Sequence, residues 1–202
     1  MRFLIILLLG WTCLFGTSLK YFGGGDFVAG FENLSLQTKN APQESFSSRS
    51  YSLGINGGVE QFWDSDNYIG GRILGEFTMG LATPNVNGTK IAGLFSFMGA
   101  MDLMLDFLPL GDSDLGIFGG FEYGLLMLTS SESYKDYKLS SETHSAFWRI
   151  GVSLLIQKEQ RIEFLYKAPL NPLSLPENVN GIKQHKVFSG GQLSVGFKAL
   201  FW

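Results

Sequence analysis

The sequence predicts an all-β protein, an eight-stranded antiparallel up-and-down β-barrel that crosses a membrane with its strands. Three observations lead to this fold. Stretches in which apolar and polar side chains alternate recur along the chain, and the connections between them are alternately short and long. Charged residues make up only 16 % of the chain, against about 25 % in soluble domains. Alternation with period two indicates strands that each have one apolar face.

Residues 1–18 predict a secretory signal peptide. Arg2 supplies the positive charge, an apolar stretch follows, and the small residues of "GTS" permit cleavage after Ser18. The apolar stretch is too short for a membrane-spanning helix. Residues 19–202 then form the predicted barrel domain. Cys13 is the chain's one cysteine and lies in the signal, so we expect no disulfides in the mature protein.

Most of the alternating stretches have the 9–11 residues that a tilted strand needs to cross a bilayer. The stretches are 20–35, 49–62, 68–82, 90–107, 115–128, 143–157, 160–168 and the C-terminal segment. Ten strands is the alternative count. In hydrocarbon every backbone N–H and C=O needs an internal partner, so the sheet must close into a barrel.

The connections predict how the barrel lies in its membrane. Short turns with Asp, Asn, Gly or charged residues fall at 64–67, 109–114 and 158–160, and longer loops fall at 38–48, 83–90, 130–142 and 170–185. Tight periplasmic turns and longer external loops are typical of outer-membrane barrels. We therefore expect the four loops on the outside of the cell.

The polar faces of these stretches carry charges that we assign to the lumen. They are the acids Asp26, Glu32, Glu60, Glu76, Asp102, Asp106, Glu122 and Glu163, and the bases Arg72, Arg149, Arg161, Lys167 and Lys198. An eight-stranded barrel is barely wide enough for its own side chains, so these charges should pair and fill it. The stretches at 115–128 and 143–157 flank the loop at 130–142, so we expect directly paired residues to have numbers that sum to about 271 or 272. Glu122 and Arg149 are therefore expected to lie directly or nearly opposite each other. The alternative, a soluble β-sandwich or lipocalin-like barrel with its apolar faces inward, does not account for such sparse charges on the other face.

The C-terminal segment "QLSVGFKALFW" is predicted to close the sheet against the first strand. Leu193, Val195, Phe197, Ala199 and Phe201 share its apolar face. A terminal strand that ends on an aromatic residue resembles the C-terminal signal of outer-membrane barrels. The alternation is in phase with Phe201, whereas the usual signal is in phase with the last residue, here Trp202. This resemblance implies the barrel-assembly machinery as a partner.

The last forty residues also resemble a narrower group. "RIEFLYKAPLNPL", a polar loop and "SGGQLSVGFKALFW" are similar to the C-terminal end of Helicobacter-type (Hop-like) outer-membrane proteins, with Lys167-Ala168-Pro169 at the family's Lys-x-Pro. The whole mature chain looks like a small outer-membrane barrel of Gram-negative bacteria. That class implies residence in the cell outer membrane, with outer-membrane lipid around the barrel. It includes adhesins and porins, so it does not select a ligand.

Residues with catalytic chemistry are few. His144 and His185 are expected near the external rim, the second at the end of a loop. Ser145 follows His144, but neighbours in a strand point to opposite faces and cannot form a nucleophile–base pair. His185 would have to meet Glu142 or Ser141 across the strand at 160–168.

The remaining motifs are better explained by turns and by packing. The two "DSD" sequences, Asp64–Asp66 and Asp112–Asp114, lie in short turns and lack the length of a calcium loop. The glycine runs "YFGGGDF" and "FSGGQ" precede no helix, and we expect them to ease crowding where the barrel closes. We predict no catalytic, cofactor-binding or metal-binding residues, and the net charge of −3 gives no reason to expect a nucleic-acid partner.

The predicted function is structural or surface interaction, of the adhesion type, through the external loops. The loops at 38–48, 130–142 and 170–185 would contact a host or surface ligand. A narrow porin or small-solute channel is the alternative. A lipid-modifying enzyme with its site at the rim is the third hypothesis.

Overall fold

The computed structural model describes residues 18–38, 44–64, 66–85, 91–129, 133–134, 137–138, 141–170, 173–179 and 182–201. The predicted signal peptide therefore lies almost wholly outside the described residues, and Ser18 is the first residue of the first strand. Within the described part of the chain, no helix has the length and apolar character needed to cross a membrane.

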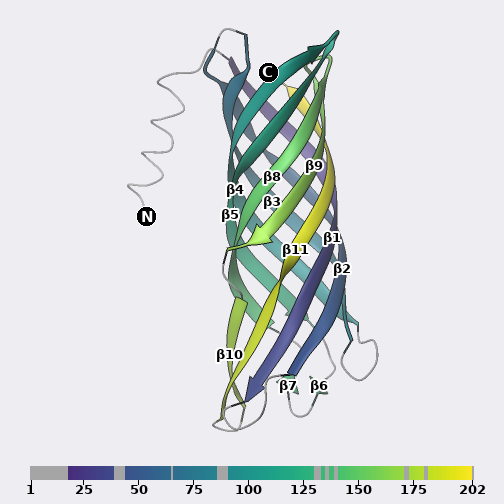
Figure 1. Ribbon diagram of the computed structural model, residues 1–202, viewed down its shortest axis with the longest axis vertical. Coiled ribbons are helices and arrows are strands. Elements are labelled where there is room, and N and C mark those ends of the chain that lie inside the picture. The colour runs from purple at the N-terminus through teal and green to yellow at the C-terminus, as the bar shows by residue number, and fades with distance from the viewer. Residues whose placement is uncertain are drawn as a thin grey trace.

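Eight long strands wind around a common axis and form a closed barrel (Figure 1). They are β1 (Ser18–Thr38), β2 (Glu44–Phe62), β3 (Ile69–Pro84), β4 (Ala92–Leu110), β5 (Ser113–Thr129), β8 (Ser141–Ile156), β9 (Gln160–Pro169) and β11 (Ile182–Phe201). Neighbours in the chain pair antiparallel, and the pairing of β1 with β11 closes the sheet. The expected fold and the expected eight barrel strands are confirmed.

The closing pair has the predicted partners. Tyr21 on β1 lies opposite Phe201 on β11, and Phe27 lies opposite Val195. Phe197, Val195 and Leu193 all face outward and are about half exposed. The alternating C-terminal segment is therefore the strand that completes the barrel.

The strands are staggered around the barrel. Following directly paired residues once around leads from Lys20 through Glu60, Arg72, Asp102, Gly120, Arg149, Lys167 and Gln192 back to Gly30 on β1. The path returns ten residues beyond its start. Such a shear requires the strands to tilt relative to the barrel axis. It also brings inward side chains from strands that are not neighbours to similar heights in the lumen.

The two ends of the barrel differ as the connection lengths predicted. The end that carries the chain's C-terminus, at the top of Figure 1, holds the three short turns, and the other end holds the long connections. We call these the short-turn end and the loop end. Gly111 and Asp112 alone join β4 to β5, and Gly111 has the positive φ of 71° that such a turn requires.

The strands extend further toward the loop end than the sequence predicted. Residues 44–48 belong to β2, so the expected loop at 38–48 is wrong in this part. The expected loop at 170–185 is wrong in part, because β10 (Leu173–Val179) pairs with the first residues of β11. Two short strands, β6 (Ser133–Tyr134) and β7 (Tyr137–Lys138), form a separate hairpin. Beyond the hydrocarbon both faces of a strand meet water, so these extensions do not need the apolar face that identifies a strand.

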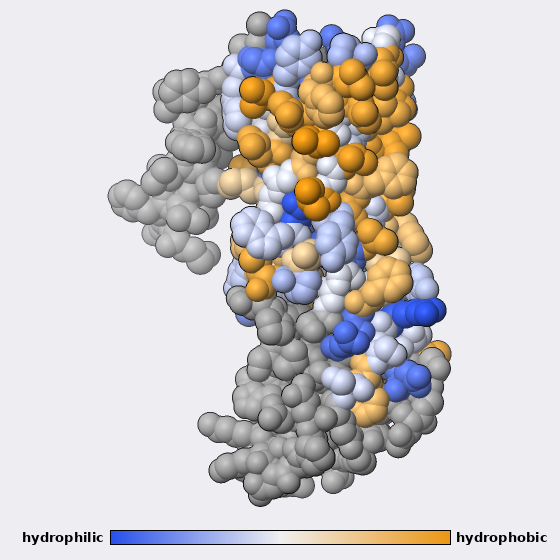
Figure 2. All heavy atoms as spheres, viewed as in Figure 1, coloured by the Kyte–Doolittle hydropathy of each residue, from blue (hydrophilic) through white to orange (hydrophobic). Residues whose placement is uncertain are grey.

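Large apolar side chains cover the outside of the barrel (Figure 2). Leu53 and Ile55 on β2, Ile150 on β8 and Phe164 on β9 are each more than half exposed. Their inward neighbours Ser52, Asn56 and Arg149 are buried. This is the reverse of a soluble barrel, whose apolar side chains would fill the interior, and it confirms the predicted assignment of the two faces.

Candidate functional site

All thirteen charges that the sequence assigned to the lumen lie there. None of these side chains is more than 9 % exposed. Lys20 is a further buried inward charge, at 4 % exposed, which the sequence analysis missed. Its even number on β1 matches that of the inward Asp26 and would have identified it, since inward positions repeat every second residue.

Arg161 on β9 organises the charges nearest the short-turn end. Its Nη1 and Nη2 donate to the two carboxylate oxygens of Asp106, at 3.0 and 2.9 Å. Nη2 also reaches Glu60 Oε1 at 3.3 Å, and Nη1 donates to Ser153 Oγ at 2.9 Å. One arginine thereby links β2, β4, β8 and β9 across the lumen.

Arg72 on β3 organises the next group. Its Nη2 lies 2.7 Å from Asp102 Oδ2, and its Nη1 donates to Glu163 Oε1. Lys198 Nζ completes the group at 2.7 Å from Glu163 Oε2. The guanidinium also faces the ring of Phe118, 4.8 Å from the ring centre, which is a cation–π distance.

Arg149 and Lys167 form a third group further toward the loop end. Arg149 Nη1 lies 2.5 Å from Glu122 Oε2, and its Nε lies 3.1 Å from Asp102 Oδ1. Lys167 Nζ lies 2.8 Å from Glu76 Oε1 and 2.9 Å from Glu122 Oε2. Because Asp102 also contacts Arg72, the second and third groups form one continuous network.

The contact between Glu122 and Arg149 is confirmed, but the expected register of β5 and β8 is wrong. Glu122 lies opposite Phe147, and Arg149 lies opposite Gly120. The two charged residues are therefore diagonal neighbours, displaced by two positions. Long side chains on one face of a sheet still meet across such a diagonal.

Glycines make room for the buried acids. Asp106, Asp102 and Asp26 each have a glycine as direct cross-strand partner, namely Gly116, Gly120 and Gly196. A Cβ at these glycines would lie 2.0, 2.5 and 2.0 Å from a carboxylate oxygen of the acid opposite. The predicted relief of crowding where the barrel closes is confirmed at Gly24, where a Cβ would lie 2.2 Å from the Phe197 carbonyl oxygen, but not at Gly23, where a Cβ would meet no atom within 4 Å.

Apolar side chains also pack in the lumen, beside inward polar side chains such as those of Thr78 and Ser96, and they were not predicted from the sequence. Phe22, Leu74, Ala100, Leu155 and Leu200 pack together in one cluster, and Met104, Phe118 and Leu165 in a second. A third cluster of buried residues consists of Ala82, Ala92, Leu94, Met98, Leu126, Leu128 and Phe147. These residues occupy inward positions, which recur at every second residue of a strand, but an apolar side chain does not by itself distinguish an inward position from an outward one.

The candidate catalytic residues do not form a site. His144 is exposed on β8, and its ring stacks on Tyr123 at 5.8 Å between centres. Ser145 points inward and is buried, so the two face opposite sides as predicted. His185 lies in β11 opposite Gln37, not in a loop as expected, and its side chain is outside the described part, as are those of Ser141 and Glu142.

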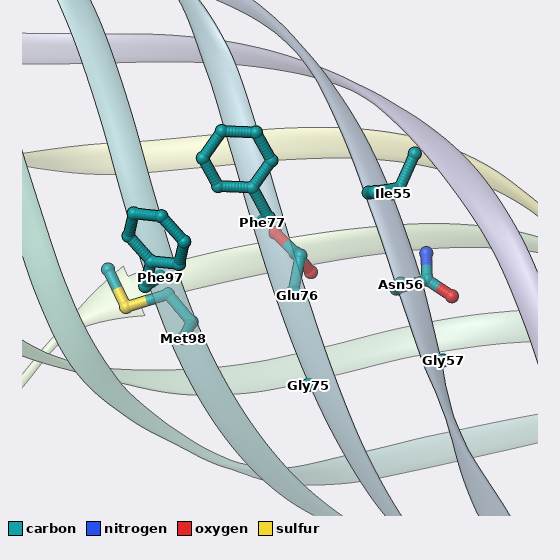
Figure 3. Close-up of a pocket in the computed structure, with 8 residues that line it drawn as sticks. All are labelled: Ile55, Asn56, Gly57, Gly75, Glu76, Phe77, Phe97 and Met98. Carbon is teal, nitrogen blue, oxygen red and sulfur yellow. The ribbon is translucent and has the colours of Figure 1, made fainter.

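A recess of about 500 Å³ indents the wall between β2, β3 and β4 (Figure 3). Gly57 and Gly75, which pair directly, belong to its lining, and a Cβ at Gly75 would have no atom within 4 Å. Ile55 and Phe97, both more than half exposed on the outer face, border it. Within the described residues no group of His, Cys, Asp or Glu side chains is arranged to hold a metal ion.

The Helicobacter outer membrane protein family model matches residues 54–198. The chain belongs to this family. As a Helicobacter-type outer membrane protein it lies in the cell outer membrane, and its apolar outer face meets the outer-membrane lipid. The predicted resemblance and localisation are confirmed.

A solved structure supports the fold of this family member. OprG from Pseudomonas aeruginosa is 13 % identical and superposes with a TM-score of 0.57, over 93 % of this chain and 98 % of OprG. Neisserial surface protein A is also 13 % identical, with a TM-score of 0.47 over 90 % of this chain and 97 % of its own. No curated protein matches the chain.

Proposed function

We propose that this Helicobacter-type outer membrane protein is a barrel with a closed lumen, which acts at the cell surface through its external loops. Its role is structural or one of surface interaction, with neither solute conduction nor catalysis. The observation that carries the proposal is the ion-pair network across the lumen. Three of its cations, Arg72, Arg161 and Lys167, are each at most 2 % exposed. Side chains that line a water-filled pore would instead be exposed to water.

The packing around these charges supports the same conclusion. Apolar clusters lie among the ion pairs, and the side chains of Leu74, Met104 and Phe118 are at most 3 % exposed. A continuous polar path would have to displace both the ion pairs and these side chains. Removing one member of a buried ion pair is costly, which favours a static plug over a gated one.

The long connections are the part of the barrel best suited to bind a partner. With the short turns in the periplasm, as the topology of this class favours, the loop end faces outward. The strands continue beyond the apolar band there, and the β6–β7 and β10–β11 hairpins add further backbone structure. A host molecule or another surface ligand would contact the chain at this end.

The absence of catalysis is also part of the proposal. Ser145 and His144 are neighbours that face opposite sides of β8, and the carboxylates of the described lumen, apart from Glu32, contact cations or amides. Assembly into the membrane would use the barrel-assembly machinery, with the β11 strand as its recognised segment.

Conductance measurements test the closed lumen. The refolded protein in planar bilayers should show no unitary conductance above the bare membrane. The matched variant, Arg72→Ala with Arg161→Ala and Lys167→Ala, removes the bulk and charge of the three most buried cations and should introduce leak currents. Steady ion-selective channels in the unmodified protein would overturn the proposal and favour the narrow porin.

A cell-binding assay tests the surface role. Loss of cell binding on replacement of residues 170–185 by a short turn, with the barrel still assembled, would support the surface role.

A further inference from the structure

Glu32 differs from every other buried acid in the described lumen. Its side chain is 3 % exposed, and Ser50 Oγ donates to its Oε1 at 2.6 Å. Among the described residues no Lys, Arg or His lies within ion-pair distance of it, and Oε2 has no hydrogen-bond partner. A buried charge without a counter-charge is unfavourable, so this carboxylate needs an explanation.

A second unpartnered polar group lies directly opposite. Ser48 on β2 pairs with Glu32 on β1. Its hydroxyl is buried, with the residue 3 % exposed, and also has no hydrogen-bond partner within the described structure. Buried polar atoms are nearly always hydrogen-bonded. Two unpaired oxygens on directly opposed residues therefore indicate a place for a hydrogen-bond donor.

The space around this pair depends on glycines. A Cβ at Gly30 would lie 2.0 Å from Glu32 Oε1 and 2.2 Å from Ser50 Oγ. On the other side, a Cβ at Gly190 would lie 2.1 Å from the Phe31 carbonyl oxygen and 2.4 Å from Glu32 Cα. The carboxylate of Glu32 thus occupies space that any side chain at position 30 would fill.

The overall charge of the lumen favours a cation as the missing partner. The buried inward residues that the structure describes comprise eight acids and six bases, counting Lys20. Seven of the acids lie within the network or beside it, including Asp26, which accepts from Asn56 Nδ2 and lies 3.8 Å from Lys198 Nζ. Glu32 is separated from that network along β1, toward the loop end.

The ligand set distinguishes between kinds of cation. Calcium takes 6–8 oxygen ligands, usually with several carboxylates, and this site has one carboxylate. A primary ammonium group has three N–H donors. Glu32 Oε2, Ser48 Oγ and a lone pair of Ser50 Oγ, whose own hydrogen goes to Glu32, supply three acceptors. We propose that Glu32, Ser48 and Ser50 bind the primary ammonium group of a small molecule that enters from the loop end of the barrel.

Methylammonium is the simplest probe of this site. The refolded protein in detergent micelles, with ¹³C-labelled glutamate carboxyl groups, is titrated with methylammonium chloride at constant ionic strength. We expect the Glu32 carboxyl signal to shift in a saturable way. Tetramethylammonium, which has the charge but no N–H, should leave the signal in place. The Glu32→Gln variant assigns the signal and should abolish the response.

Further variants separate the site from its surroundings. Ser48→Ala removes one acceptor and should weaken methylammonium binding roughly 10-fold or more, the typical worth of a hydrogen bond to a charged group. Glu159→Gln, in the exposed turn at the other end of the barrel, should change nothing. The ammonium group of the chain's own Lys186 is an alternative occupant of the site, because this residue pairs with Leu36, four residues beyond Glu32. If Lys186 does not occupy the site, Lys186→Gln should leave the affinity for methylammonium unchanged.

Four outcomes would overturn the proposal. They are the absence of any saturable shift, an equal shift with tetramethylammonium, saturation by calcium at lower concentrations than methylammonium, and tighter binding in Lys186→Gln. If Glu32→Gln does not refold, the Ser48→Ala and tetramethylammonium comparisons still decide the question. The result is independent of whether the loops bind a surface partner.

Discussion

Arg149 and Glu122 meet inside the barrel at 2.5 Å, although neither is the direct cross-strand partner of the other. The two residues are diagonal neighbours on β5 and β8, and their long side chains span the distance between them. The direct partner of Arg149 is Gly120. Lys167 approaches the same carboxylate from β9. Glu122 is therefore held between two cations on neighbouring strands, and its replacement affects both.

Charge reversal at Arg149 should strongly destabilise the barrel. Arg149→Glu leaves Glu122 and Asp102 beside a third negative charge with little water nearby, and breaking a buried pair typically costs about 3–5 kcal/mol. Adding Glu122→Arg should restore part of the loss, because Lys167 and Asp102 keep their original charges. The free energy of unfolding by urea in lipid vesicles is measured for the unmodified protein, the two single variants and the double variant. Strict additivity would contradict the contact, since coupled neighbours depart from it by about 0.5–3 kcal/mol. Arg49→Glu, at an exposed position, is the matched control.

Chemical labelling on intact cells should report the orientation. A cysteine at Ser133, in the β6–β7 hairpin, should react with a membrane-impermeant thiol reagent, whereas one at Ser113, beside the β4–β5 turn, should not. The chain's own cysteine, Cys13, lies in the predicted signal peptide and would not compete. After the cells are broken open, both positions should react. The reverse pattern on intact cells would place the loop end in the periplasm.

Removal of Phe201 and Trp202 should lower the amount of protein assembled in the outer membrane. Phe201 pairs with Tyr21 at the closing seam, and its outward side chain is 53 % exposed. The truncation leaves the rest of the seam intact, so the refolded protein should lose less stability than its assembly yield suggests. Leu193→Ala, on the same face in mid-strand, is the control for lost apolar surface. Normal yield of the truncated chain would argue against a terminal assembly signal.

Two glycine substitutions should have opposite consequences. Gly120→Ala places a Cβ 2.0 Å from the Met101 carbonyl oxygen and 2.5 Å from Asp102 Oδ1, so we expect a loss of at least about 1–3 kcal/mol from overpacking. Gly75→Ala meets no atom within 4 Å and should be neutral or slightly stabilising, since glycine costs about 0.5–1 kcal/mol in a strand. Urea unfolding of both variants gives the comparison. Equal losses would mean that the inward glycines are not there to accommodate the acids.

The faces of the strands could be predicted from the sequence because lipid imposes a strict condition on every second residue. In a membrane barrel Phe27 must face the lipid and its neighbour Asp26 the lumen, and the same holds for Ile150 and Arg149. Register is different, because a slip of two residues keeps every face and therefore leaves the same pattern. That is why the contact between Glu122 and Arg149 was predicted correctly from a wrong alignment of their strands.

The parts that escaped prediction are those where the alternation carries no information. Residues 44–48 and 173–179 form strands at the loop end, where a strand does not need the lipid-facing apolar residues that identify a membrane strand. Leu94 and Met98 sit at inward positions within a stretch that is apolar on both sides, so composition alone did not show that they fill the lumen. The isolation of Glu32 depends on side-chain positions that the sequence does not encode locally.

The ion pairs of the lumen join residues that are far apart in the chain. Arg72 and Glu163 are separated by 91 residues, and Glu60 and Arg161 by 101. These contacts form only after β9 has reached the early strands, which requires nearly the whole chain. Contacts of such long sequence separation slow folding. The ion-pair network therefore stabilises a partly formed sheet little and the closed barrel much, so closure of the barrel should be cooperative. Partly assembled chains lack this stabilisation and should remain accessible to quality-control proteases.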